Sequence, residues 1–333
     1  MRAYDQGGST YQHLGDRNLK FRSGYEKLIG KGGMNMKIGN REFDLKNGYY
    51  IMGILNVTPD SFSDGGRYIG VGEALAHIEQ MIEDGADIID IGGESIKPGH
   101  EKISEIAEID RVCPVIERIK REFDIPISLD TYKAGVAEAG ISSGADMIND
   151  IWGLKWSEEL AKVAGMKYSG DMASVVAKAG VPINLMHNRV NPNDAPNSSI
   201  GGLVDNSENI FGYGEDVVGE VISDLQEILK LAKESGISDD KIILDPGIGF
   251  GKLLHENLKT MGGLDRIAAL GYPILLGASR KSMIGQTLDL PVEEREEGTI
   301  ATTVFGAMKG AHIFRVHDVK KNKRALKMFE AMK

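Results

Sequence analysis

The chain has 333 residues, of which 41% are hydrophobic and 26% are charged, so it has enough apolar material for a large core and is not a disordered protein. Its formal net charge of -10 argues against a nucleic-acid-binding protein, which needs a basic face. The one cysteine, Cys113, cannot form an internal disulfide, and neither a signal-peptide pattern nor a long apolar run occurs. We therefore expect a cytoplasmic protein that does not enter a membrane.

The first 35 residues are rich in Gly, Lys and Arg and show no apolar periodicity. We interpret residues 1–35 as a flexible extension or a cloning remnant, and residues 36–333 as one domain. From Met36, residues 36–54 contain a short alternating stretch, a turn with Asn and a second extended run. This pattern predicts a β-hairpin that leads into the first core strand and plugs the bottom of a barrel.

From Tyr50 onward, short β-branched runs alternate with segments of helical period, which is typical of repeated βα units and a parallel sheet. Eight strands are predicted, at residues 49–56, 86–94, 125–130, 145–150, 181–187, 241–245, 272–279 and 311–318. The helices predicted between them include residues 71–85, 103–123, 215–236 and 296–310. Eight consecutive units favour a (β/α)8 TIM barrel with an N-terminal hairpin. The alternative, an open doubly wound sheet, would need a G-x-G-x-x-G turn that is missing after the first strand.

Each predicted strand is apolar until its last one or two residues, where polar side chains appear. These are Asn56, Glu94, Ser95, Asp130, Asn149, His187, Asp245, Ser279, Arg315 and His317. In a barrel the carboxyl ends of all strands meet on one face, so the pattern predicts a single polar pocket there.

Two motifs near strand ends bear on anions and metals. The glycine-rich residues 247–252 lack the spacing of a nucleotide-binding phosphate loop, and their glycines more plausibly let the backbone approach a flat ligand. Arg315 and His317 lie two apart on one strand, hence on one face, and fit an anion site. The alternative for Arg315 is an ion pair with a nearby acid such as Asp318. His187 and His255 lack the spacing of a zinc site.

The runs MGILNVTPDSFSDGG, DIIDIGGES, SLDTYKA, LDPGIGFGK, LLGASRKSMIG and FRVHDV occur in this order. Together they closely resemble the dihydropteroate synthase family, from about Met36 to the end of the chain. The resemblance implies a transferase of folate biosynthesis that joins 6-hydroxymethyl-7,8-dihydropterin pyrophosphate to p-aminobenzoate, releases pyrophosphate and is a target of sulfonamides. It also implies a homodimer and a bound Mg²⁺.

The resemblance assigns residues to each part of the site. Those implied to bind the pterin are Asp130, Asn149, Met186, Asp245, Phe250, Gly277 and Lys281. Those implied to bind pyrophosphate are Asn56, Ser95, Arg315 and His317, with Asn56 as the Mg²⁺ ligand. Those implied to shape the p-aminobenzoate pocket are Phe62, Ile96, Lys97, Pro98 and Ser279. The catalytic residues implied are Asp130, Lys281, Arg315 and His317.

The chain departs from the family pattern in one loop and two segments. Where the family usually has E-S-T-R-P-G, this chain has Ile96 and Lys97 in place of Thr and Arg. Extra residues occur around 166–172 and at 191–214. Two other functions therefore stay open, a methyltransferase that binds a pterin in the same type of barrel and a pterin-binding protein without activity. The SRKS and R-x-H motifs favour the synthase over the methyltransferase.

Overall fold

The computed structural model describes residues 35–57, 67–94, 102–163, 165, 168, 170–190 and 212–333. Its centre is a sheet of eight parallel strands: β3 (Tyr50–Asn56), β4 (Ile88–Gly92), β5 (Ile127–Asp130), β6 (Met147–Asp150), β7 (Ile183–Met186), β8 (Ile242–Asp245), β9 (Leu275–Leu276) and β10 (Ile313–Val316). Their order in the sheet is β8-β7-β6-β5-β4-β3-β10-β9. A parallel bridge between Leu244 and Ile274 joins the two edges. The predicted barrel is therefore confirmed.

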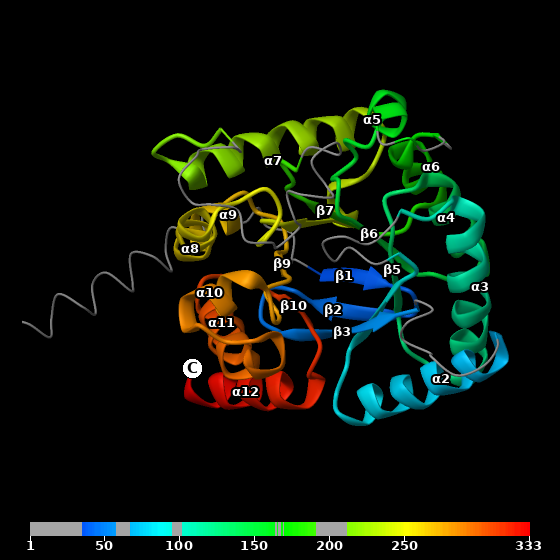
Figure 1. Cartoon of the computed structure of the whole chain (residues 1–333), viewed down its shortest axis with the longest axis horizontal. Coiled ribbons are helices and arrows are strands. Elements are labelled where there is room, and N and C mark those ends of the chain that lie inside the picture. The colour runs from blue at the N-terminus through cyan, green and yellow to red at the C-terminus, as the bar shows by residue number, and fades with distance from the viewer. Residues whose placement is uncertain are drawn as a thin grey trace, which may run out of the picture.

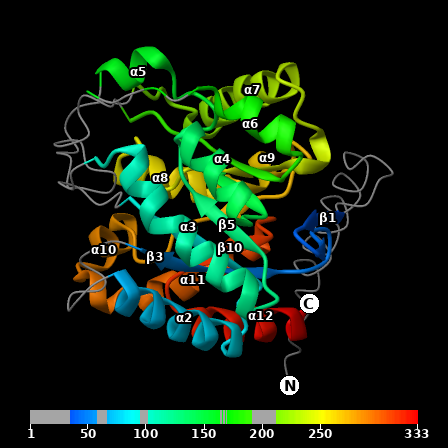
Figure 2. The same ribbon diagram turned by 90° about the vertical axis from the view of Figure 1, so that its right-hand side faces the viewer.

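Helices surround the barrel on its outside (Figures 1 and 2). They are α2 (Arg67–Glu83), α3 (Glu105–Glu122), α4 (Ala134–Ser143), α5 (Glu158–Val163), α6 (Met172–Ala179), α7 (Val217–Glu234), α8 (Leu254–Gly262), α9 (Leu264–Ala268), α10 (Ser282–Leu288), α11 (Glu296–Met308) and α12 (Val319–Met332), with short 3-10 helices η2 (Asp239–Lys241) and η3 (Val292–Glu294). None of these described helices is long and apolar enough to span a lipid bilayer.

The helix boundaries follow local capping signals. At the start of α3, the hydroxyl of Ser104 accepts a hydrogen bond from the amide of Ala107 at 3.2 Å. At the start of α7, the carboxylate of Asp216 accepts one from the amide of Gly219 in the same way. Most elements are shorter than predicted, above all β9, which has two residues where 272–279 was predicted, whereas α2 is longer at its start, at Arg67 and not at Val71. The glycines at the start of that segment have low helix propensity, which hid its first turn from the sequence pattern.

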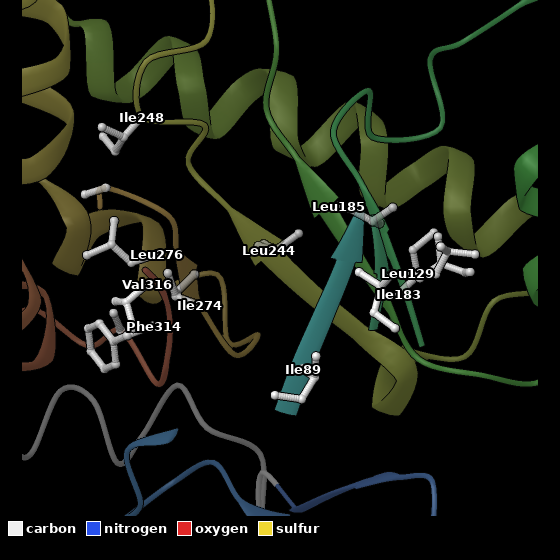
Figure 3. Close-up of a cluster of buried hydrophobic side chains, with 14 of the residues drawn as sticks. Ile89, Leu129, Ile183, Leu185, Leu244, Ile248, Ile274, Leu276, Phe314 and Val316 are labelled. Carbon is white, nitrogen blue, oxygen red and sulfur yellow. The ribbon is translucent and has the colours of Figure 1, made fainter. Parts of the chain in front are cut away.

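Alternate residues of each strand point outward and pack against the helices (Figure 3). This cluster includes Ile89, Leu129, Ile183, Leu185, Leu244, Ile274, Leu276, Phe314 and Val316. Because side chains alternate across a strand, the residues between them point into the barrel. The fold thus delivers every second strand residue to the interior.

The N-terminal hairpin closes one end of that interior. Strands β1 (Asn35–Ile38) and β2 (Arg41–Asp44) pair antiparallel, with Met36 opposite Phe43. The buried side chains that meet here are Met36, Ile38, Phe43 and Leu45 from the hairpin and Met52, Ile88, Met147, Ile243, Leu275 and Ile313 from the strands. The predicted plug is confirmed, and the hairpin begins one residue before Met36. We call this end the floor of the barrel and the end formed by the carboxyl ends of the strands the mouth; β1 and α10 lie at opposite ends in Figure 2.

Candidate functional site

Three strands bring charged side chains together around Gly277, at the mouth of the barrel. A methyl group on Gly277 would lie 3.8 Å from Asp245 Oδ2, 3.9 Å from Lys281 Nζ and 4.0 Å from Arg315 Cδ. These are ordinary van der Waals distances, so glycine leaves room for a methyl group beside a carboxylate and two cationic side chains. The motifs of β8, β9 and β10 therefore converge on one point, as expected for a barrel mouth.

Arg315 is held by two carboxylates from neighbouring parts of the wall. Its Nε donates to Asp90 Oδ2 at 2.5 Å, and its Nη2 donates to Asp130 Oδ2 at 2.6 Å. Burial raises the pKa of the Asp130 carboxyl to about 7, although the charge of Arg315 opposes the shift. The ion pair given as the alternative for Arg315 is therefore present, but its partners are Asp90 and Asp130. The acid given as an example, Asp318, instead caps α12 by accepting from the amide of Lys321 at 2.9 Å.

Asn149 belongs to a chain of buried amides below Arg315. Its Nδ2 donates to Asp90 Oδ2 at 3.2 Å, and its Oδ1 accepts from Asn184 Nδ2 at 2.8 Å. All three residues are buried. Because the Asn149 amide has a partner at each end, Asn184 on the neighbouring strand β7 and Asp90 on β4, the orientation of its side chain is fixed before any ligand arrives.

Asp245 and Lys281 lie on either side of the glycine-rich loop at residues 247–252. Asp245 Oδ1 accepts from the amide of Gly247 at 2.7 Å, while Lys281 Nζ donates to the carbonyl of Ile248 and lies 4.5 Å from the centre of the Phe250 ring. Burial raises the pKa of Asp245 and lowers the pKa of Lys281 to about 8, each shift being opposed by the charge of the other residue.

The loop is held from behind by Lys252. Lys252 Nζ donates to the carbonyls of Gly247 at 2.9 Å and Phe250 at 3.3 Å, and to His187 Nδ1 at 2.8 Å. Burial and the charge of Lys252 lower the pKa of His187 to about 3, so the ring is neutral and its Nε2 donates to Asp224 at 2.9 Å. His187 therefore supports the loop and does not face the mouth with the other strand ends.

The backbone conformation of this loop requires glycine at two positions. Gly247 has φ 67°, and a Cβ atom there would lie 1.8 Å from the carbonyl oxygen of His187. Gly249 has φ 82°, and a Cβ atom would lie 3.0 Å from Lys281 Cδ. The close approaches at both glycines are to other parts of the protein, and the predicted approach of this backbone to a flat ligand stays a prediction.

The remaining described residues of the predicted anion and aminobenzoate sites lie at the mouth. Ser279 Oγ is 2.9 Å from His317 Nδ1 and accepts from the amide of His317 at 3.2 Å. A Cβ atom on Gly92 would lie 3.7 Å from Asn56 Oδ1 and 3.8 Å from Asp130 Oδ2, so these two oxygens lie on the same side of the barrel. Phe62, Ser95, Ile96, Lys97 and Pro98 lie outside the described residues.

Met186 and Phe250, the predicted apolar walls, are both buried in a small cluster beside the barrel mouth. Their neighbours in it are Tyr132, Ile151, Trp152, Trp156 and Ala161. Each of the two is 2% exposed, so in the free protein they contribute to packing. A ligand-contacting role for either residue stays a prediction.

A second buried charge cluster lies next to the site, where the described chain resumes after residues 95–101. Lys133 Nζ donates to Glu94 Oε2 and Glu108 Oε2, both at 2.6 Å, and to the carbonyl of Ile103 at 2.8 Å. Tyr132 donates to the other oxygen of Glu94 at 2.8 Å. Glu94 was predicted as a polar strand end, and the structure gives it a local role in joining these elements.

Sequence analysis missed the polar residues inside the strands. Asp90 on β4, Ser128 on β5 and Asn184 on β7 are each 0% exposed, and Asp90 Oδ1, Ser128 Oγ and Asn184 Oδ1 have no hydrogen-bond partner in the described part of the chain. A polar residue in the middle of an otherwise apolar parallel strand was the available signal.

The site combines acceptors, donors and cations around Gly277. Asp245 offers acceptor oxygens, Asn149 an oriented amide, and Lys281 and Arg315 donors with positive charge. Such a set suits a flat polar ring joined to an anion. Among the described residues, no three His, Cys, Asp or Glu side chains are grouped in a way that would hold a metal ion.

Comparison with known proteins agrees with this chemistry. The family model described as "Pterin binding enzyme" matches residues 52–317. A dihydropteroate synthase from Clostridium beijerinckii is 53% identical over 294 residues, which cover 88% of this chain and 97% of that protein. A crystal structure of the Clostridium difficile dihydropteroate synthase, determined with pteroic acid, is 43% identical with a TM-score of 0.74 and covers 87% of this chain and 98% of that one. The Xanthomonas albilineans enzyme with 4-aminobenzoic acid is 36% identical with a TM-score of 0.76, covering 90% and 98%.

Proposed function

Because this chain belongs to the family of pterin-binding enzymes and is a dihydropteroate synthase, we propose how the residues at its barrel mouth divide the work of the reaction. The enzyme joins 6-hydroxymethyl-7,8-dihydropterin pyrophosphate to p-aminobenzoate and gives 7,8-dihydropteroate and pyrophosphate. The observation that carries the assignment is the convergence of Asp245, Lys281 and Arg315 around Gly277.

Asp245, Asn149 and Lys281 bind the pterin. One oxygen of Asp245 is occupied by the amide of Gly247, which leaves Oδ2, beside Gly277, for the amino and ring N–H donors of the pterin edge. Lys281 donates to the pterin carbonyl, and the fixed amide of Asn149 pairs with a further ring position. The absence of a side chain at Gly277 lets the flat ring lie between these groups.

Arg315 and His317 bind the pyrophosphate. The guanidinium is already oriented by two carboxylates, and Ser279 holds the ring of His317 through its Nδ1, so little ordering is needed when the anion arrives. As the bond between the pterin methylene and the pyrophosphate oxygen breaks, the electron pair leaves with that oxygen, where these cationic or donor groups stabilise it. Asp130 stabilises the cationic methylene that remains.

The aminobenzoate nitrogen then attacks the methylene, the new C–N bond forms and the nitrogen loses a proton. No residue of the chain needs to act as a nucleophile, because the attacking group belongs to the substrate. Ser279 forms part of the aminobenzoate pocket, with Phe62, Ile96, Lys97 and Pro98 as the further proposed members, and Ser95 joins the pyrophosphate site. The main work of the protein is to position the groups and to stabilise charge.

We propose that Mg²⁺ binds with the pyrophosphate at Asn56. The exposed Asn56 offers one neutral oxygen near Asp130, and this fits an ion that keeps several waters and takes phosphate oxygens from its substrate. When bound, the ion would neutralise charge on the leaving group. A chelator should therefore stop turnover reversibly and leave the melting temperature of the free protein almost unchanged. A large fall in that temperature would contradict this assignment.

The substitution Asp245→Asn tests the pterin assignment. It replaces the free acceptor with an amide that can present N–H groups to the donors of the pterin, and affinity for the pterin pyrophosphate should fall by roughly 1.5–3 kcal/mol, the usual contribution of a hydrogen bond to a charged group. Isothermal titration calorimetry gives the dissociation constant. Unchanged affinity in a folded variant would remove Asp245 from the site and would weaken the whole assignment.

We also propose a homodimer and a cytoplasmic location. Exposed apolar side chains occur on α10, η3 and α11, namely Leu288, Val292, Phe305 and Met308. Apolar residues gathered on neighbouring elements are typical of an interface. The substitution Met308→Asp should convert a dimer to a monomer in light scattering, whereas Ile106→Asp, on the exposed side of α3, should not. A monomeric unsubstituted protein would contradict the dimer.

The single free cysteine, Cys113, supports a reducing compartment and hence the proposed cytoplasmic location.

A further inference from the structure

Asp90 joins two parts of the barrel wall that are far apart in the sheet. Along the sheet the order is β6, β5, β4, β3, β10, so β4 lies midway between the strand of Asn149 and the strand of Arg315. One oxygen of Asp90 accepts from both residues, from Arg315 Nε at 2.5 Å and from Asn149 Nδ2 at 3.2 Å. The proposed pyrophosphate site and the proposed pterin site therefore share a single anchor.

We propose that Asp90 is a positioning residue of the reaction, which holds the guanidinium of Arg315 and the amide of Asn149 in a fixed relation to each other. The pterin and its pyrophosphate are parts of one substrate, so the groups that bind them must keep their spacing while the bond between them breaks. A small displacement of one group would separate the stabilising charge from the oxygen on which charge develops. This inference rests on the role proposed above for Arg315.

The other carboxylate that holds Arg315 is not suited to this task. Asp130 has 9% of its side chain exposed and is proposed to face the reacting methylene, so its own interactions change during the reaction. The side chain of Asp90 is 0% exposed, and its two partners are residues of the protein. Of the two carboxylates, only Asp90 can therefore keep the same contacts before and after the leaving group departs.

The cost of keeping a carboxylate at this position supports a functional reason for it. Asp90 Oδ1 is buried and has no hydrogen-bond partner among the described residues, and an unpaired buried acceptor lowers stability. An apolar side chain, as at Ile88 on the same strand and face, would avoid that cost. The charge of Asp90 therefore has a role only at its second oxygen, which accepts from Arg315 and Asn149.

The test is a double-mutant cycle between Asp90 and Arg315, with kcat and KM measured for both substrates. Asp90→Asn keeps the shape but removes the charge, and kcat should fall by about tenfold to a hundredfold, as for other displacements of catalytic groups. The KM for p-aminobenzoate should change by less than about twofold, because neither Arg315 nor Asn149, the two partners of Asp90, is a proposed member of that pocket. In the Arg315→Ala background the same substitution should change kcat by less than about threefold, because the guanidinium that acts on the leaving group is absent and the remaining partner of Asp90, Asn149, is proposed to bind the pterin ring.

Ser128→Ala is the matched control. Ser128 is opposite Asp90 in the register of β4 and β5, is buried and also has an unpartnered polar atom, so its substitution perturbs the same layer without touching Arg315. It should leave kcat within about twofold. If Asp90→Asn does not fold, as judged by circular dichroism, Asp90→Glu replaces it in the cycle, because it keeps the charge but displaces the carboxylate.

Four results would be decisive. A normal kcat in folded Asp90→Asn, or an equal loss in both Arg315 backgrounds, would overturn the positioning role. An equal loss in Ser128→Ala would show that any disturbance of the layer lowers kcat, and would overturn it as well. A normal kcat in Arg315→Ala alone would instead overturn the proposed function of Arg315, so the two failures are distinguishable.

Discussion

The floor and the mouth of the barrel are lined by the same strands but are built in opposite ways. At the floor, the inward residues are apolar and the hairpin covers them, so Ile88 and its neighbours are fully packed. Two residues further along β4 the inward residue is Asp90, and the interior from there to the mouth carries charges, amides and unpartnered polar atoms. The difference indicates that folding stability is concentrated at the floor, which allows the mouth to keep groups that a ligand will satisfy.

The largest expected effect is at the floor. Phe43→Ala removes a buried ring from the hairpin and should lower the free energy of unfolding by roughly 3–5 kcal/mol, measured by urea denaturation. In the protein that remains folded, KM for both substrates should stay unchanged, because Phe43 lies at the opposite end from the site. Phe43→Leu, which keeps an apolar side chain, should cost less than about 1.5 kcal/mol. An effect on KM without loss of stability would contradict the division between a stabilising floor and a functional mouth.

At the mouth, a substitution should lower activity and leave the fold intact. Arg315→Ala removes a donor to the leaving group and should lower kcat by about a hundredfold to a thousandfold. The fold should survive, but the carboxyl of Asp130 loses the cation that holds its pKa down, so that pKa rises further above about 7 and the folded variant keeps a proton that the unfolded chain has lost. The stability deficit relative to the unsubstituted protein should therefore grow as the pH rises above about 7. Normal turnover, or a deficit that shrinks with rising pH, would contradict this.

The pH dependence of kcat/KM sharpens the same contrast, because the titrating groups lie at the mouth. Asp130, with a pKa of about 7, must be ionised to stabilise the cationic methylene, so activity should be lost as the pH falls through that value. Lys281, with a pKa of about 8, must keep its proton, so activity should also fall above it. The profile should be a narrow bell. Lys281→Arg should extend its alkaline side, and a profile flat from about pH 6 to about pH 9 would contradict both roles.

The smallest effect concerns the loop in which this chain departs from the family. Ile96 cannot form the hydrogen bond of a threonine, and Lys97 lacks the planar fork of an arginine. The double substitution Ile96→Thr with Lys97→Arg should therefore lower both KM for p-aminobenzoate and the inhibition constant of a sulfonamide. Affinity for the pterin should hardly change. If neither value shifts by more than about twofold, near 0.4 kcal/mol, these positions do not govern that pocket.

The elements of the fold were predictable because each is encoded locally. The apolar run that became β8 ends at Asp245, and the alternation in residues 36–54 produced the hairpin. Position within the barrel was predictable for strand ends because topology alone brings them together. The partners of those residues were not: Asp90 contacts Arg315 across 225 positions of the chain, and a pattern within one strand cannot show that pairing.

His187 shows a second limit of the sequence. It follows a strand as Asp245 does, yet it pairs with Lys252 and Asp224 and not with the groups around Gly277. Strand-end position predicts which edge a residue reaches, but the direction of its side chain depends on partners from other elements. Lys252, which has the appearance of a phosphate-binding lysine in the sequence, supports a loop through carbonyl oxygens for the same reason.

The position of the hairpin has a practical consequence for work with this enzyme. Asn35 begins β1 at the floor, so anything attached ahead of it joins the fold at the end opposite the substrates. An affinity tag or a surface-immobilisation linker placed there should leave access to the mouth open. A truncation that continues past Asn35 and through Ile38 is a different matter, because it removes Met36 and Ile38 from the apolar cluster and exposes the interior of the barrel to water.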